Sequence, residues 1–334
     1  MSNKPRLAVT MGDPSGVGAE VVVKAFEQNA FQNQVNAFVI GSVECLKQEM
    51  QICGTDYPVQ LRGQVSDLLG QPGMIEVVDP VGFDMADHVY GQVSAAAGQA
   101  AVGYFEYAVN LALDSQLDGV VTCPINKEAV HAAGFVDDIG HQEILARMTG
   151  STLTATMLMT EGLKVAHLST HKSLIEAALY VKQAIIFQKL ELTASHLRSW
   201  MGREPKIAVA ALNPHGGEGG MLGREEIEEI APAVEQARQS GLDVAGPYPA
   251  DSVFYRAVAG EFDAVLALYH DQGHIAIKMH NFAESITATM GIPFLRTSVD
   301  HGTAFDIAGK NQADAEGLRC AIDQAAQMLR GELR

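Results

Sequence analysis

Three histidines carry the strongest chemical signal in this sequence. His171, His215 and His270 each follow or end a short apolar stretch that predicts a buried strand. In open α/β folds, ligands gather beyond the carboxyl ends of strands, so the three side chains could meet at one point. Three imidazoles would hold a zinc-like transition metal and leave coordination positions open for a substrate hydroxyl. The separations are too long for a local metal motif, however, and a lone strand-end histidine is more often a hydrogen-bonded structural residue.

Two of these histidines lie in glycine-rich loops. Residues 213–220 read Asn-Pro-His-Gly-Gly-Glu-Gly-Gly, and residues 269–274 read Tyr-His-Asp-Gln-Gly-His. Such loops bring backbone amides close to a ligand, although ordinary turns have the same composition. Lys278 follows the second loop and Arg296 lies further along the chain. Either cation could bind a carboxylate or phosphate, or lie on a solvated surface.

Two further segments could contact a ligand through their backbone. Residues 300–310, rich in polar and small side chains, suit a loop that wraps a flat polar ligand, although they also fit a plain loop before the last helix. Residues 11–20 follow a strand and open a helix with glycines at 12, 16 and 18. They match neither the dinucleotide fingerprint nor a Walker loop, so a structural strand-to-helix turn is favoured.

The order of apolar and amphipathic segments predicts the fold class. Short runs rich in Val, Ile and Leu lie at residues 7–10, 37–40, 119–123, 165–168, 207–212 and 264–269. Helices are predicted at residues 94–115, 173–200, 224–240 and 315–329. This alternation is typical of α/β layers with a largely parallel sheet. A length of 334 residues predicts two lobes. Because no flexible linker separates them, we expect the chain to cross from one lobe to the other more than once and a cleft to lie between them.

Composition excludes several classes of partner. The formal charge of -17 arises from 40 acidic and 23 basic residues without a block of like charge, so nucleic acid and anionic membranes would be repelled. The four cysteines have no metal-ligand spacing and are too few for a disulfide scaffold. With no visible signal peptide and no apolar run of membrane-spanning length, we expect a soluble, cytoplasmic protein.

Taken together and in this order, these segments resemble the 4-hydroxythreonine-4-phosphate dehydrogenase (PdxA) family of vitamin B6 (pyridoxine) biosynthesis. The matching pieces run from Met11 to Lys310, and Asn-Pro-His-x-Gly-Glu with Tyr-His-Asp-Gln-Gly is highly specific. Residues 300–310 also resemble the NAD-binding loop of isopropylmalate and isocitrate dehydrogenases. The resemblance implies their two-lobed α/β/α fold with mixed, largely parallel sheets and the active site in the interlobe cleft. We place the lobes at residues 1–127 plus 303–334 and at residues 128–302, the second carrying the metal and substrate residues.

The resemblance implies a role for each matching residue. The metal ligands, for zinc or alternatively cobalt or magnesium, are His171, His215 and His270. The substrate-binding positions are His141, Gln142, Lys278, Thr287 and Arg296. The positions that bind NAD or NADP are His301, Gly302, Thr303, Ala304 and Asp306. The family also implies a homodimer whose active site is built from both subunits.

Two substrate positions depart from the family pattern. Members usually carry His-Thr where this chain has His141-Gln142, and Gly-Val-Asn where it has residues 285–287, which end at Thr287. Groups of this kind discriminate strongly between substrates, so the chemistry should be retained while the substrate differs. The alternatives within the wider family are threonate or erythronate phosphate and aromatic cis-dihydrodiol carboxylates.

The implied chemistry is oxidation of a small anionic hydroxy acid. A metal held by the three histidines would polarise the substrate hydroxyl, a base would take its proton, and hydride would pass to the nicotinamide, with decarboxylation if the product is a β-keto acid. Lys127 and Asp251 are candidates for proton transfer, although a lysine opening a helix and an aspartate capping one are the commoner explanations. A metal-dependent hydrolase and a non-catalytic small-molecule binding protein are the rival functions, and residues 300–310 favour the dehydrogenase over both.

Overall fold

A computed structural model describes residues 4–28, 30–86, 88–138 and 140–334. The chain divides into two compact units, one of residues 1–152 and 292–329 and the other of residues 153–291 and 330–334. The sequence predicted lobe boundaries at residues 127 and 302, whereas the two units divide near residues 152 and 291. Both units are α/β, and within the described residues no helix is long and apolar enough to cross a membrane.

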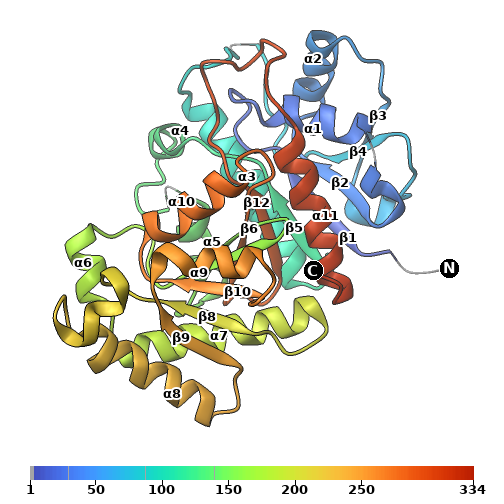
Figure 1. The fold of residues 1–334 in the computed structure, drawn as a ribbon. Coiled ribbons are helices and arrows are strands. Elements are labelled where there is room, and N and C mark those ends of the chain that lie inside the picture. The colour runs from blue at the N-terminus through green and yellow to red at the C-terminus, as the bar shows by residue number, and fades with distance from the viewer. Residues whose placement is uncertain (1–3, 29, 87, 139) are drawn as a thin grey trace. The chain divides into compact units, whose positions relative to one another are not determined.

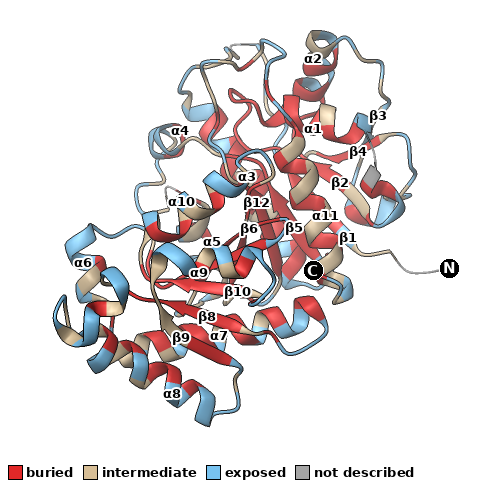
Figure 2. Ribbon diagram, viewed as in Figure 1, coloured by how far each residue is buried: buried red, intermediate tan, exposed pale blue. Residues whose placement is uncertain are grey.

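Unit 1 is built on six parallel strands in the order β3-β4-β2-β1-β5-β12 (Figure 1). Its strands are β1 (Arg6–Thr10), β2 (Asn36–Ile40), β3 (Val59–Arg62), β4 (Ile75–Val78), β5 (Gly119–Thr122) and β12 (Leu295–Val299). Its helices are α1 (Gly18–Gln28), α2 (Val43–Cys53), α3 (Ala95–Leu113), α4 (Lys127–Ala132), α5 (His141–Thr149) and α11 (Glu316–Arg330), with short 3-10 turns at Ala30–Asn33 and Val65–Asp67. The central strands are almost wholly buried, as parallel strands covered on both faces should be (Figure 2).

Unit 2 has a mixed set of strands in the order β11-β6-β7-β10-β8-β9. The strands are β6 (Ala155–Thr160), β7 (Leu163–His167), β8 (Ile207–Ala210), β9 (Val244–Tyr248), β10 (Ala264–Ala267) and β11 (Ile286–Met290). Strand β6 runs antiparallel to β7 and β11, whereas β7, β10, β8 and β9 are parallel. The helical segments are α6 (Leu174–Leu179), α7 (Gln183–Met201), η3 (Pro214–Gly220), the π-helical η4 (Glu226–Ile230), α8 (Ala231–Gln239), α9 (Ala250–Val258) and α10 (His270–His280).

The six predicted strands and the predicted helices at residues 94–115 and 315–329 are confirmed within a few residues. The single helix predicted at residues 173–200 is wrong, because the chain breaks between α6 and α7. Val181 turns fully into the core at the break. Helix α7 then restarts where Glu229 accepts a hydrogen bond from the Gln183 amide at 2.8 Å and pairs with Lys182. An isolated helix start needs such a partner for its free amides.

Candidate functional site

The three candidate metal ligands follow three neighbouring parallel strands of unit 2. His171 comes four residues after β7 ends, His215 five residues after β8 ends, and His270 three residues after β10 ends. Strand β10 pairs with β7 on one side and with β8 on the other. The topology therefore brings the three loops that carry these histidines to the same edge of the unit 2 strands, where ligands of α/β folds collect.

Buried polar side chains fasten these loops to one another. The Gln272 Oε1 atom accepts from the Leu268 amide at 2.8 Å, and its Nε2 donates to the Ala211 carbonyl oxygen at 2.8 Å, so it joins the ends of β10 and β8. The Ser169 hydroxyl donates to the Leu268 carbonyl oxygen at 3.0 Å and joins the ends of β7 and β10. These residues form a rigid base for the loops, and sequence analysis did not single them out.

The loop that carries His215 has an unusual backbone. Residues 215–219 all have positive φ, including the non-glycine residues His215 (54°) and Glu218 (47°). Such conformations cost energy and persist only when the surroundings impose them. Buried Glu226 does so, because its Oε1 atom accepts from the Leu212 and Asn213 amides at 2.8 and 2.7 Å. The left-handed loop is therefore held at its start by a carboxylate on the π-helical turn.

Two of the three histidines are oriented by neighbouring carboxylates. The Nδ1 atom of His215 lies 2.8 Å from Glu218 Oε1, and the Nδ1 atom of His270 lies 2.7 Å from Asp271 Oδ1. Carboxylates on the second ring nitrogen are typical of metal-ligating histidines, because they fix the tautomer and leave Nε2 as the donor. The donor chemistry thus fits a zinc-like ion, although in the part of the chain that the structure describes no three His, Cys, Asp or Glu side chains are grouped closely enough to hold one.

A stack of imidazoles lies beside His270. The His274 ring stacks on the His270 ring with centroids 3.6 Å apart and planes 11° apart, and the His167 ring lies 4.7 Å from that of His274. His167 is 1% exposed, and burial, followed by the nearby His274 and His270, lowers its pKa to about 3. Its ring is therefore neutral at physiological pH. Neither His167 nor His274 was predicted as a site residue, although His274 lies in the glycine-rich segment of residues 269–274.

In unit 1, Arg296 and His141 form a pair suited to an anion. Arg296 is 4% exposed, its Nη2 donates to the Thr122 hydroxyl at 2.6 Å, and burial lowers its pKa to about 10, so it remains charged. The His141 residue reaches solvent in part, but its Nε2 atom is buried. Burial and the Arg296 charge hold the pKa of His141 well below its usual value. A neutral imidazole next to a buried guanidinium can bind a phosphate or carboxylate without a second positive charge to desolvate.

The candidate cofactor loop is fixed by the glycine-rich turn of residues 11–20. The Val17 amide donates to the Thr303 carbonyl oxygen at 3.0 Å, and a Cβ on Gly16 would lie 2.9 Å from Thr303. Thr303 is buried, Ala304 has a φ of 45°, and the flanking residues His301, Gly302 and Asp306 are exposed. The turn therefore acts as a support for this loop, in agreement with its structural interpretation.

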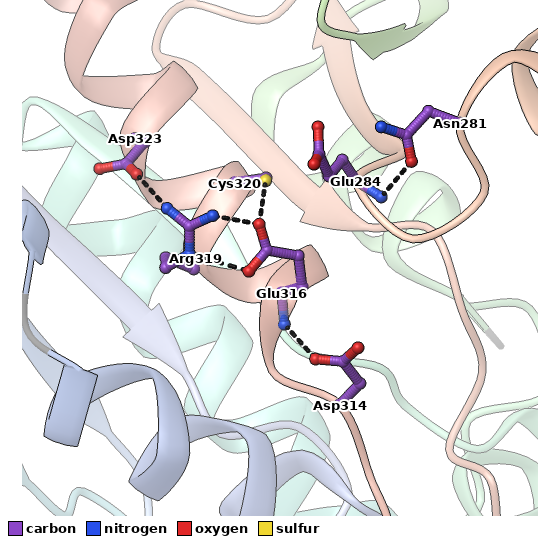
Figure 3. Close-up of polar contacts among 7 residues, drawn as sticks. All are labelled: Asn281, Glu284, Asp314, Glu316, Arg319, Cys320 and Asp323. Atoms are coloured by element: carbon purple, nitrogen blue, oxygen red, sulfur yellow. Dashed lines mark hydrogen bonds and ion pairs between the residues drawn. The ribbon is translucent and has the colours of Figure 1, made fainter.

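Beyond residues 300–310, the chain is anchored just before α11. The Ala313 amide donates to Glu20 Oε1 at 2.8 Å, which ties the segment to α1. Figure 3 shows the network that follows, in which Glu316 pairs with Arg319 and accepts from the Cys320 thiol. Figure 3 also shows the turn after α10, where the Glu284 amide donates to Asn281 Oδ1 at 3.2 Å ahead of β11.

The remaining candidates lie on helix starts and on β11. Lys127 is exposed in the first turn of α4, whose cap is the Asn126 side chain. Asp251 is exposed in the first turn of α9 and does not cap it. Gln142 is half-buried in the first turn of α5, and half-buried Thr287 lies on β11 opposite Leu158. Lys278 on α10 places its ammonium 4.5 Å from the Phe282 ring centroid.

Comparison with known proteins identifies the family. The family model "Pyridoxal phosphate biosynthetic protein PdxA" matches residues 33–325. The chain is 42% identical over 327 residues, 98% of this chain and 97% of the relative, to a protein of Symbiobacterium thermophilum provisionally named D-threonate 4-phosphate dehydrogenase. It is 40% identical over 325 residues, 97% of each chain, to D-threonate 4-phosphate dehydrogenase of Cupriavidus necator. The crystal structure of 4-hydroxythreonine-4-phosphate dehydrogenase from Klebsiella pneumoniae is similar with a TM-score of 0.89 at 38% identity, covering 98% of this chain and 100% of that one.

The fold and these matches define an NAD(P)-dependent oxidoreductase that acts on a small phosphorylated hydroxy acid, in a family that uses a divalent metal. This chain belongs to the PdxA family. The predicted resemblance and the predicted α/β class are thereby confirmed. Within the family, the names of the two similar relatives agree better with the threonate phosphate alternative than with 4-hydroxythreonine phosphate and pyridoxine biosynthesis.

Proposed function

We propose that this protein oxidises D-threonate 4-phosphate, or a closely related four-carbon sugar acid phosphate, with NAD or NADP. The observation that supports this substrate most is the pair of relatives named for it, each matching nearly the whole chain at about 40% identity. The departures at Gln142 and Thr287 agree with it, because they remove the threonine hydroxyl and asparagine amide that the 4-hydroxythreonine-4-phosphate branch carries there.

The residues of the chain divide the task between anion binding and metal binding. Buried Arg296 and neutral His141 would hold one anionic end of the substrate, with Lys278 as a further cation. His171, His215 and His270 would hold a divalent metal in the dimer proposed below, because within the described part of a single chain no three such side chains lie close enough to share an ion. Zinc matches these ligands best, since imidazole suits it better than magnesium. Residues His301, Gly302, Thr303, Ala304 and Asp306 would contact the dinucleotide. When bound, the metal supplies Lewis-acid polarisation of the substrate hydroxyl and the nicotinamide supplies the hydride acceptor.

Proton transfer is assigned to an exposed acid or base at a helix start. Lys127 or Asp251 would take the hydroxyl proton, and each lies in a first helical turn where its side chain reaches solvent. Oxidation of a hydroxyl β to the carboxylate gives a β-keto acid, which would lose carbon dioxide. Release of carbon dioxide in step with NADH would therefore accompany the reaction.

The substrate assignment is tested by comparing catalytic efficiencies. We expect kcat/KM for NADH formation to be higher with D-threonate 4-phosphate than with 4-hydroxythreonine 4-phosphate, erythronate 4-phosphate or an aromatic cis-dihydrodiol carboxylate. Equal or higher efficiency with 4-hydroxythreonine 4-phosphate would reject the assignment. Hydrolysis of a phosphate ester without NADH would favour the hydrolase, and tight binding without turnover would favour a binding protein.

We also propose that the protein works as a homodimer that shares its active site, as its family resemblance implies. Helices α6 and α10 of unit 2 expose large apolar side chains, which a second copy could cover. These are Leu174, Ile175, Leu179, Ile275 and Met279. A specific interface should exceed about 1,000 Å². Sedimentation of the wild type and of Ile175→Glu should give a dimer and a weakened dimer, whereas an active monomer at high dilution would contradict the proposal.

A further inference from the structure

The imidazole stack beside His270 has no role in the site as the sequence predicts it. His270 is partly exposed, with 43% of its side chain reaching solvent, so its ring would lose rotamer freedom on binding a ligand. The His274 ring covers one of its faces at 3.6 Å and is nearly parallel to it. The contact to Asp271 sets the direction of Nδ1 and the stack sets the plane of the ring, so together they define where Nε2 points.

His274 itself makes two further contacts. Its Nδ1 atom lies 3.0 Å from the His270 carbonyl oxygen, one helical turn back. The buried His167 ring also packs against it, with centroids 4.7 Å apart and planes 56° apart. His167 is the last residue of β7. The stack therefore connects the core of unit 2 to His270 at the start of α10.

The packing around His167 leaves room for this ring and little else. A Cβ on Gly273 would lie 2.3 Å from His167 Nε2 and 2.8 Å from Val165 Cγ1, so only glycine fits at that position of α10. Neither ring nitrogen of His167 makes a hydrogen bond of normal geometry, although backbone groups of Thr156 and Val165 lie near it. An apolar side chain of similar shape would avoid the free-energy cost of burying these nitrogens without hydrogen-bond partners. A buried imidazole at this position is therefore less favourable than an apolar side chain if the residue only fills space.

We propose that His274, backed by the buried ring of His167, is a positioning residue that fixes the ring plane of His270 for binding a divalent cation. The inference rests on the proposed function, because it takes His270 to be a metal ligand. Residues that orient metal ligands typically change metal affinity by about 10–100-fold when they are removed. Loss of the His274 ring should therefore weaken cation binding while leaving the ligand set in place.

The experiment measures Co²⁺ binding to the full-length protein by calorimetry and by the visible absorption bands of the bound ion. His274→Ala should weaken Co²⁺ binding by about 10–100-fold and alter the bands. His274→Phe keeps a flat ring against His270 and should retain most of the affinity. His280→Ala is the matched control, since His280 is an exposed histidine on the same helix, and it should bind as the wild type does.

Each outcome separates this inference from the proposed function. Wild-type affinity and spectrum in His274→Ala, with binding lost in His215→Ala, would overturn the positioning role and leave the metal site intact. Equal losses in His274→Ala and His274→Phe would also overturn it, because the stacked ring would then not be what matters. Wild-type protein that binds no Co²⁺ would overturn both the metal site and the inference.

Discussion

Replacing the buried Asp13 by asparagine should change how stability depends on pH. As the pH rises, the free energy of unfolding of Asp13→Asn should increase relative to that of the wild type. Asp13 lies in the glycine-rich turn of unit 1, is fully buried, and accepts a hydrogen bond from the Ser15 amide through Oδ1 at 2.8 Å. Burial raises its pKa from 3.8 to about 6, against the opposing effect of the Ser15 and Asn126 backbone amides. Asparagine keeps an oxygen for Ser15 and cannot ionise.

The sign and size follow from proton linkage. Below pH 3.8 the carboxyl is protonated in both the folded and unfolded states and costs nothing. Between 3.8 and about 6 the unfolded chain ionises while the folded chain keeps its proton, so the free energy of unfolding falls as the pH rises. Above about 6 the loss is complete, and it amounts to at most about 3 kcal/mol. Asp13→Asn cannot ionise at this position, so its free energy of unfolding does not fall in this way as the pH rises.

The assay is urea unfolding of both proteins between about pH 4 and about pH 7. The absolute stability of Asp13→Asn is less informative, because its amide NH₂ could be left without a partner, at a cost of about 1–3 kcal/mol that does not depend on pH. We therefore expect the difference between the two proteins to shift by about 2–3 kcal/mol in favour of the variant across this range. Asp137→Asn, which removes an exposed carboxyl, is the matched control. A flat difference, or one that shifts toward the wild type, would refute the reasoning.

Three further predictions concern packing, anion binding and specificity. Gly18→Ala should lower the free energy of unfolding by about 3 kcal/mol or more, because a Cβ there would lie 2.0 Å from the Met11 carbonyl oxygen. Gly302→Ala is the control and should change the urea midpoint little, because a Cβ at Gly302 would meet open space. Arg296→Lys should raise KM for the anionic substrate by about 10–100-fold through loss of the guanidinium fork, and an unchanged KM would remove Arg296 from the binding site. Gln142→Thr with Thr287→Asn should shift the ratio of kcat/KM toward 4-hydroxythreonine 4-phosphate, each group contributing about 0.5–1.5 kcal/mol, and an unchanged ratio would make these positions neutral.

Much of the fold follows from local sequence patterns, while the support of the site does not. The apolar runs that became β1, β5 and β10 could be located because buried parallel strands are continuously apolar. The places of His171, His215 and His270 after strand ends were also visible. That the loops carrying them lie at one edge of the unit 2 strands depends on the strand order β7-β10-β8, which no local pattern contains.

The residues that support the site could not be predicted, because each one contacts residues that are far away in the sequence. Gln272 donates to the carbonyl oxygen of Ala211, 61 positions away, and His167 meets His274 through the pairing of β7 with β10. Asp13 looked like part of a turn, and only its complete burial identifies it as a titrating group. Glycines at 16 and 273 could be read from the sequence only as turn or loop residues, since their close contacts to Thr303 and His167 depend on tertiary packing.

The central claim is metal-dependent oxidation at the three histidines. The most direct measurement is NADH formation from D-threonate 4-phosphate by wild-type protein before and after metal removal with a chelator, and by His215→Ala. We expect chelation to abolish turnover, zinc or cobalt to restore it, and His215→Ala to remain inactive with either ion while unfolding at the same urea concentration as the wild type. Full NADH formation by the metal-free protein, or by His215→Ala, would contradict the account.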